Sequence, residues 1–174
     1  MIYFTSDQHF GHANIINMCN RPFKDVEHMN ATLIDNWNSV VTEEDEVYIL
    51  GDLSFKGNVS RINIILRQLL GKKYLIRGNH DKYLDAYQFD KSNYVWVKDY
   101  YELDYNNAKL ILFHYPIYEW AHFYRKSAHL YGHNHRPKKP PFEEWGQRSF
   151  NVGVDLNEFK PVSIEKIYSK IFDR

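Results

Sequence analysis

Short apolar runs, rich in β-branched and aromatic residues, recur along the 174-residue chain and predict strands. Continuous runs of three to five such residues are typical of strands that are covered on both faces of a sheet. The predicted strands cover residues 2–4, 47–50, 74–76, 110–113 and 129–131. The segment 94–104, followed by the turn sequence YNNAK, predicts a β-rich insertion or a hairpin.

Helical periodicity separates several of these runs. Between residues 26 and 41, apolar residues repeat at the 3.6-residue spacing of an amphipathic helix. Ser60 is a candidate N-cap for a second helix through Leu69, with Gly71 just past its end. Pro161 and Ser163 precede a third helical pattern at 164–171. Alternating strands and helices indicate a layered α/β architecture.

Polar and metal-ligating residue types follow each predicted strand. Ligands gather at the carboxyl ends of strands in α/β sheets, so these segments are expected to form one site. The residues are Asp7 and His9, then Gly51 and Asp52, then Gly78, Asn79, His80 and Asp81, then His114, and finally His133 and His135.

The residue types in these motifs indicate divalent metal ions. Carboxylate, imidazole and amide ligands without a thiolate suit Mn, Fe or Zn. The set is too large for one tetrahedral ion and fits two ions about 3.5–4 Å apart, as used for phosphoryl transfer to water. Glycines at 51, 78 and 132 allow the backbone to turn close to the metals. Alone, DQH and Gly51-Asp52 are compatible with solvated turns and His114 with a core histidine, whereas GNHD and GHNH are more specific. The joint occurrence of all five after successive strands favours the metal site.

Composition limits the remaining possibilities. Lys and Arg together number 22, as do Asp and Glu, so the balanced formal charge disfavours non-specific nucleic-acid binding without excluding nucleic acid. The lone cysteine, Cys19, cannot form an intrachain disulfide. No signal peptide or membrane-length apolar run is readable. We therefore expect one cytoplasmic domain over residues 1–174.

The motifs DQH (7–9), GD (51–52), GNHD (78–81), His114 and GHNH (132–135) resemble the signature of the calcineurin-like metallophosphoesterase superfamily. The match extends through residues 1–135, and NVGVD (151–155) resembles the strand that commonly follows the last motif. HFGHANII, RPF and NWN are similar to segments of small bacterial and phage phosphoesterases. The resemblance implies a four-layer α-β-β-α sandwich, with two mixed β-sheets flanked by helices.

The resemblance also implies a role for each signature residue. One ion is expected on Asp7, His9 and His135, the second on Asn79, His114 and His133, with Asp52 bridging both. His80 is the implied general acid, and the neighbouring Asp81 is expected to orient its imidazole or raise its pKa. The implied reaction is phosphoester hydrolysis by a hydroxide that bridges the two ions.

Residues outside the signature carry further candidate contacts. His12 lies three residues after His9 and is a candidate phosphate contact, with a surface histidine as the alternative. Arg21 could bind phosphate or the leaving group through its planar fork, or be held by a local carboxylate. The aromatic run 116–124 could stack a base, although covering the core is favoured. Arg136, Lys138 and Lys139 could attract a polyanion or simply be solvated.

The expected function is hydrolysis of a phosphodiester or phosphomonoester in a small molecule or nucleotide, with a lean toward diesters. The alternatives are a nuclease, which the balanced charge disfavours, and a metal-binding scaffold without physiological turnover. The intact ligand set and His80 favour an enzyme. Mn²⁺ is the first choice of metal, with Fe²⁺ and Zn²⁺ as alternatives; the oligomeric state is left open.

Overall fold

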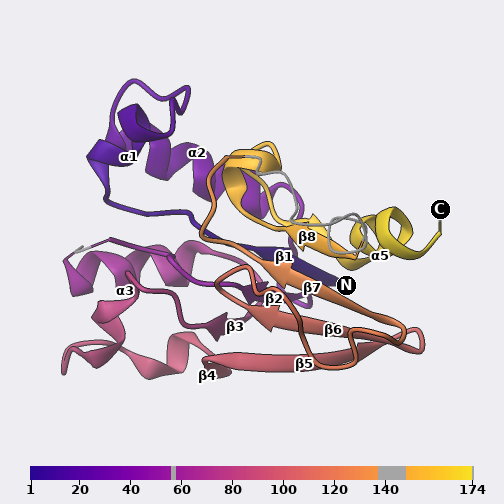
Figure 1. The fold of residues 1–174 in the computed structure, drawn as a ribbon. Coiled ribbons are helices and arrows are strands. Elements are labelled where there is room, and N and C mark those ends of the chain that lie inside the picture. The colour runs from indigo at the N-terminus through magenta and orange to yellow at the C-terminus, as the bar shows by residue number, and fades with distance from the viewer. Residues whose placement is uncertain (56–57, 137–147, 174) are drawn as a thin grey trace.

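The computed structural model describes residues 1–55, 58–136 and 148–173, and its strands form two facing sheets (Figure 1). The first sheet consists of β1 (Ile2–Thr5), β2 (Glu46–Ile49), β3 (Lys72–Ile76), β4 (Trp96–Lys98) and β9 (Val162–Ser163). The strand order is β4-β3-β2-β1-β9, and only β9 runs antiparallel to its neighbour.

The second sheet consists of β5 (Tyr100–Tyr105), β6 (Ala108–Phe113), β7 (Ser127–Tyr131) and β8 (Ser149–Asn151), in that order. β5 pairs antiparallel with β6, whereas the pairs β6–β7 and β7–β8 are parallel. Both sheets are therefore mixed, as predicted. The short strand β9 was not foreseen. The NVGVD segment (151–155), which the resemblance implied to be a strand, contributes only Asn151 to β8 and continues into a 3₁₀ turn at Val154–Leu156.

Helices cover the outer face of the first sheet. These helices are α1 (Ala13–Met18), α2 (Val26–Asn38) and α3 (Val59–Gln68). Met29 and Leu66 pack in one cluster with Val47 and Leu75, whose side chains point away from the second sheet. The alternation of side chains along each strand separates this cluster from the core between the sheets.

The core between the sheets is built from the opposite faces of the same strands. Phe4 and Ile76 from the first sheet share a buried cluster with Leu112 and Leu130 from the second. The C-terminal helix α5 (Ile164–Phe172) adds Ile164, Ile167 and Ile171 to this cluster. The predicted α/β architecture of two mixed sheets flanked by helices is confirmed.

The segment between β6 and β7 covers the outer face of the second sheet. Trp120 and Phe123 form a buried cluster with Ile111, and the Trp120 indole donates to Ser127 Oγ at 3.0 Å. Tyr118 and Tyr124, by contrast, are exposed. Two of the four aromatics in the run 116–124 therefore cover the core.

The observed helix ends refine the sequence predictions. α3 begins at Val59, and Asn58 rather than Ser60 is its cap, since the Asn58 side chain accepts from the Ser60 and Arg61 amides. Leu69 lies one residue beyond its end. Ser163 caps α5 as predicted, by accepting from the Lys166 amide. Within the described part of the chain, no helix has the length and apolarity that crossing a membrane requires.

The predicted β-rich insertion is shared between the two sheets. β4 extends the first sheet beside β3, whereas β5 and β6 form an antiparallel hairpin in the second. The two residues of the hairpin turn, Asn106 and Asn107, have φ of 48° and 59°. Two successive positive φ values between paired strands define a type I′ turn, which asparagine tolerates.

Candidate metal centre

The loops that follow β1, β2, β3, β6 and β7 meet at one edge of the paired sheets. Backbone hydrogen bonds tie them together: the Asp7 amide donates to the Gly51 carbonyl at 3.0 Å, and the His9 amide donates to the Asp52 carbonyl at 3.1 Å. The Gly132 amide donates to the His114 carbonyl at 2.9 Å. The predicted signature motifs therefore lie in one place.

Asp7, His9 and His135 form a first cluster, in which one potential ligand atom of each lies within 4.8 Å of the others. His135 Nε2 is 3.9 Å from Asp7 Oδ1. Asp7 Oδ1 and His9 Nε2 are buried and have no hydrogen-bond partner among the described residues. Unpaired buried polar atoms are costly, and a cation between them would satisfy both. This group fits a metal ion.

Asp52, His114 and His133 form a second cluster within the same distance limit. Asn79 joins it, because its Oδ1 lies 3.1 Å from His114 Nε2. The other ring nitrogen of His114, Nδ1, donates to the Leu50 carbonyl at 2.7 Å. With Nδ1 as the donor, the neutral form of the ring would present an unprotonated Nε2 to a metal.

Asp52 lies between the two clusters. Its Oδ2 is 3.7 Å from His9 Nε2 in the first cluster and 3.4 Å from His114 Nε2 in the second. Its other oxygen, Oδ1, accepts from the His80 amide at 2.8 Å. The carboxylate is thus held by one oxygen and presents the second to histidines of both clusters.

Burial and neighbouring charge set the protonation of the site. Burial lowers the pKa of His9 to about 2, which keeps the imidazole neutral. Burial raises the pKa of Asp7. Burial also acts to raise the pKa of Asp52, but hydrogen bonding and charge from His114 outweigh it and lower the pKa overall. A divalent ion would favour the ionised form of both carboxyl groups.

Two glycines let the motif backbones approach these side chains. A Cβ on Gly78 would overlap Asp52 Oδ1 and come within 2.5 Å of the Asp52 amide nitrogen. A Cβ on Gly132 would lie 2.6 Å from Asp7 Oδ2 and overlap Ser6 Oγ. Real Cβ atoms do not approach this closely, so both positions require glycine to place the carboxylates.

Asp81 does not contact the His80 ring as the sequence suggested. Its carboxylate is fully buried and accepts three backbone hydrogen bonds, from Asp52 (2.9 Å), Leu53 (3.0 Å) and Gly78 (2.8 Å). Burial raises its pKa to about 6, against the opposing effect of the three N–H donors. Asp81 therefore holds the Asp52 loop beside the Gly78 loop. It positions the site residues through hydrogen bonds to their backbone amides.

Arg21 is likewise not available for phosphate. Its guanidinium is fully buried and donates to both oxygens of Asp155, each at 2.8 Å. The remaining donors contact the carbonyls of Asp7 at 2.7 Å and Gln8 at 2.8 Å, and Met29 Sδ at 3.5 Å. The predicted alternative was a surface arginine held by a local carboxylate. Arg21 does bind a carboxylate, but its side chain is buried and Asp155 is 134 positions away in the sequence.

Asp155 is a site residue that the sequence analysis missed. Its Oδ2 accepts from His135 Nδ1 at 2.8 Å, which directs the other ring nitrogen toward Asp7. Burial acts to raise the Asp155 pKa, but hydrogen bonds from His135 and Arg21 lower it overall. Cys19 forms a third group of potential ligands with His135 and Asp155. The only available signal was the acidic residue that ends NVGVD.

His12 and His80 border the clusters. His12 precedes α1 at its N-cap position, with its Nδ1 3.4 Å from His9 Nδ1. The His80 Nε2 lies 3.9 Å from Asp52 Oδ2. Phe55 stacks on His12 with ring centroids 4.0 Å apart and meets His80 edge-on at 4.7 Å. His12 is therefore close to the site, as expected.

Tyr115 also borders the second cluster and was not singled out from the sequence. Its hydroxyl donates to Asn79 Oδ1 at 3.3 Å, and its ring lies 4.8 Å from those of His114 and His133. Its position directly after His114 was the available signal. Of the predicted basic group, Arg136 donates to the Met18 carbonyl at 3.0 Å, whereas Lys138 and Lys139 lie outside the described residues.

Comparisons with known proteins identify a family model and similar chains. The family model described as calcineurin-like phosphoesterase matches residues 1–101. The uncharacterized protein MJ1445 of Methanocaldococcus jannaschii is 39% identical over 172 residues, covering 98% of this chain and 90% of that protein. The Gene 66 protein of Mycobacterium phage L5 is 42% identical over 81 residues, covering 45% of this chain and 39% of that protein.

A solved structure extends the similarity to the fold. The protein of unknown function AQ665 from Aquifex aeolicus superimposes with a TM-score of 0.77 at 28% identity, covering 96% of this chain and 97% of that one. The family match and the two Asp/His clusters together support divalent-metal binding. On the family model and the near full-length relative, this chain belongs to the calcineurin-like phosphoesterase family.

Proposed function

We propose that the protein is a dinuclear metal-dependent phosphoesterase that hydrolyses phosphodiester or phosphomonoester bonds of a small molecule or nucleotide. The main support is the position of Asp52, whose Oδ2 faces one histidine of each cluster at 3.4–3.7 Å. In this proposal one ion is held by Asp7, His9 and His135, the second by Asn79, His114 and His133, and Asp52 is shared.

Two divalent ions at such a site supply an acidified water and stabilise negative charge on phosphoryl oxygens. The surrounding residues hold the ligands in place: Leu50 and Asp155 orient the rings of His114 and His135, and Asp81 braces the Asp52 loop. Preorganised ligands of this kind add to metal affinity.

His80 is the proposed proton donor to the leaving group. Its backbone amide is fixed on Asp52 Oδ1, and its side chain is 35% exposed, so a substrate can reach the ring. The ring lies beside the second cluster without being part of it. A positioned imidazole of this kind contributes about 10²–10⁴-fold to a proton-transfer step.

The direct test measures hydrolysis of a chromogenic phosphodiester and the matching monoester with Mn²⁺, and then with Fe²⁺ and Zn²⁺. Metal-dependent turnover of either ester supports the proposal, and the preferred ester directs the substrate search. Asp52→Asn should reduce both metal content and turnover. Two tightly bound ions with full turnover in Asp52→Asn would refute the shared-ligand assignment.

His80→Ala separates the enzyme from a scaffold on the same fold. We expect this variant to keep its metal and lose most hydrolysis of an alkyl ester, whose leaving group needs a proton. A nitrophenyl ester should be affected less, because its leaving group is stable as an anion. Equal hydrolysis of the alkyl ester by both proteins would contradict the role of His80.

A further inference from the structure

A cavity of about 590 Å³ lies directly beside the second cluster. Residues from two segments line it: Phe55 and Val59, and then Asn79, His80, Lys82, Tyr83 and Ala86. A volume of this size lies within the range of small-molecule sites. Because Asn79 belongs to the second cluster and His80 borders it, and both line the cavity, a ligand could reach the cavity and the metal centre together.

The lining of the cavity is mainly apolar and includes aromatic rings. Phe55, Val59 and Ala86 contribute carbon surface, and Tyr83 adds its ring because its hydroxyl is engaged with Tyr94 at 2.7 Å. The edge-on contact of Phe55 with His80, at 4.7 Å, joins this apolar surface to the imidazole. Such a lining favours a flat, apolar group over a small alcohol.

Lys82 adds a cationic side chain to the lining of the cavity. Lys82 is exposed, and among the described residues no carboxylate forms an ion pair with its ammonium group. Its backbone amide donates to the His80 carbonyl at 2.8 Å, which keeps the residue close to the proposed proton donor. An unpaired cation within the cavity favours a negatively charged ligand.

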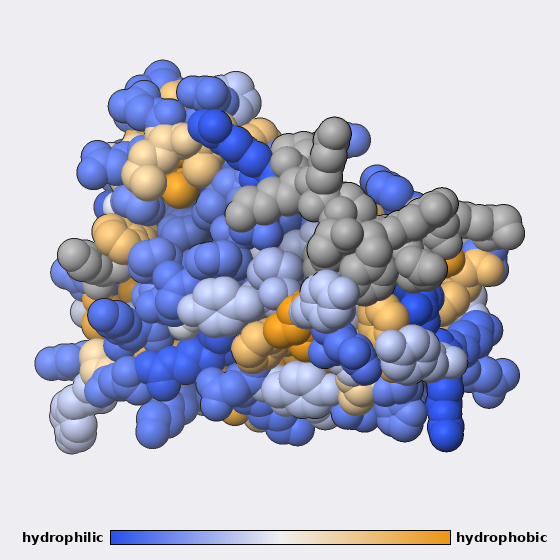
Figure 2. Space-filling model, in the orientation of Figure 1, coloured by the Kyte–Doolittle hydropathy of each residue, from blue (hydrophilic) through white to orange (hydrophobic). Residues whose placement is uncertain are grey.

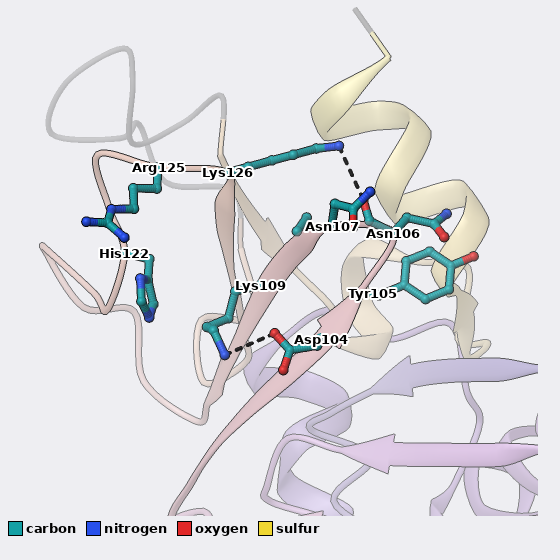
Figure 3. Close-up of a pocket in the computed structure, with 9 residues that line it drawn as sticks. Asp104, Tyr105, Asn106, Asn107, Lys109, His122, Arg125 and Lys126 are labelled. Carbon is teal, nitrogen blue, oxygen red and sulfur yellow. Dashed lines mark hydrogen bonds and ion pairs between the residues drawn. The ribbon is translucent and has the colours of Figure 1, made fainter.

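Another groove of the described chain does not offer the same combination. It has a volume of about 630 Å³ and lies at the turn between β5 and β6 (Figure 3). Lys109 there is paired with Asp104 and Glu102, and Lys126 contacts Asn106 and Tyr168. The groove begins at the start of β6, about 20 Å from His114 by strand length.

We infer that the cavity beside His80 binds the leaving group, and that it selects leaving groups that carry a ring system and a negative charge beyond the scissile phosphate. This inference rests on the proposed function. Hydrolysis forms a bond from phosphorus to water oxygen and breaks the ester bond, while His80 gives a proton to the leaving oxygen. The rest of the leaving group therefore lies next to His80, where the ring surface and Lys82 are found.

The test compares the binding of phosphonates to the Mn²⁺-loaded protein by calorimetry, so that leaving-group reactivity plays no part. The probes are methylphosphonate, benzylphosphonate and 3-carboxybenzylphosphonate. We expect benzylphosphonate to bind about tenfold more tightly than methylphosphonate, because its ring enters the apolar cavity. The carboxylate should add a further gain that depends on Lys82.

Two variants and one control assign these gains to the cavity. Ala86→Leu narrows the cavity and should reduce the benzyl gain without changing methylphosphonate binding. Lys82→Met should remove only the carboxylate gain, and this exposed change does not threaten folding. Tyr87→Leu is the control, since Tyr87 is 99% exposed and does not line the cavity.

The outcomes separate the two proposals. If methylphosphonate binds in a metal-dependent manner but Ala86→Leu leaves the benzyl gain intact, the leaving-group cavity is refuted and the phosphoesterase stands. If no phosphonate binds the metal-loaded protein and no ester is hydrolysed, both proposals are refuted.

Discussion

Asp7, His9, Asp52 and His133 share a backbone conformation that few side chains adopt. Their φ values lie between 54° and 67°, in the left-handed region. Such residues outside glycine cost on the order of 1–3 kcal/mol each, and they persist only where the surrounding structure enforces them. Aspartate and histidine tolerate the region better than most residues. Four of the ten non-glycine residues with positive φ in the described chain are therefore proposed metal ligands.

Gly78→Ala should disrupt the site by steric overlap with Asp52. We expect a loss of about 1–3 kcal/mol of unfolding free energy and a reduced metal content, because a packed neighbour must move. Urea unfolding and elemental analysis measure these quantities.

Gly11→Ala provides the matched control. Gly11 has a φ of 79°, yet no atom lies within 4 Å of its added Cβ. We expect it to cost about 1 kcal/mol through backbone strain alone and to leave the metal content intact. A normal metal content in Gly78→Ala would contradict the proposed crowding.

Asp155→Asn tests the residue that orients His135. Replacing the carboxylate weakens the hydrogen bond to His135 Nδ1, and losses of this kind lower metal affinity about 10–100-fold. Competition with a coloured chelator measures the affinity, and circular dichroism verifies folding. Asp35→Asn, an exposed change on α2, is the control. Equal affinities in all three proteins would show that Asp155 serves only Arg21.

At the scale of elements, the hairpin turn between β5 and β6 offers a clean test of local conformation. Asn107 has a φ of 59°, which glycine adopts freely and valine does not. We expect Asn107→Gly to be neutral or stabilising and Asn107→Val to lose about 1–3 kcal/mol. Urea unfolding of the pair measures the difference. Equal stability of the two variants would rule out a type I′ turn.

The elements that the sequence predicts best are those with a continuous apolar signal. Every predicted strand has a counterpart, because a run such as 110–113 must be buried on both faces. The two-residue strand β9 carries no such signal. Its position beside β1 is decided by tertiary packing, which local pattern does not encode.

The site residues also differ in whether the sequence alone predicts them. The Asp, Asn and His motifs mark strand ends and could be found from the sequence. The partners of Arg21 and Asp81 could not, because each side chain bonds groups brought together only by the fold. Arg21 and Asp155 are 134 positions apart, and nothing in the local sequence of either one predicts their contact.

For the whole molecule, His129 predicts how stability depends on pH. The ring is fully buried between β6 and the segment that covers it, with its nitrogens 3.1 Å from the carbonyls of Ile111 and Tyr115. Burial lowers its pKa from 6.5 to about 4. Between these values the unfolded chain takes up a proton that the folded protein does not, so stability falls as the pH drops from 6.5 to 4.

The expected contribution of His129 is roughly 3 kcal/mol, fully present above pH 6.5 and lost by pH 4. His129→Gln should therefore show a shallower loss of unfolding free energy over this range, whatever its stability at pH 7. His28→Gln, at an exposed position, is the control. The same pH slope in His129→Gln and the parent would contradict the prediction.

The face shown in Figure 2 is mainly hydrophilic, with hydrophobic residues in small separate patches. Scattered apolar residues of this kind are normal on protein surfaces. The candidate metal centre lies instead at the edge where the strands end.

Each of the two clusters draws residues from both sheets. Asp7 and His9 follow β1 in the first sheet, whereas His135 follows β7 in the second; Asp52 and His114 are divided in the same way. A bound ion would thus link the two sheets through their side chains. An ion present at 1,000 times its dissociation constant would add about 4 kcal/mol to the free energy of unfolding. Removing the ions with a chelator would therefore destabilise this edge of the two sheets first. Amide hydrogen exchange would become faster there before it became faster in the hydrophobic core.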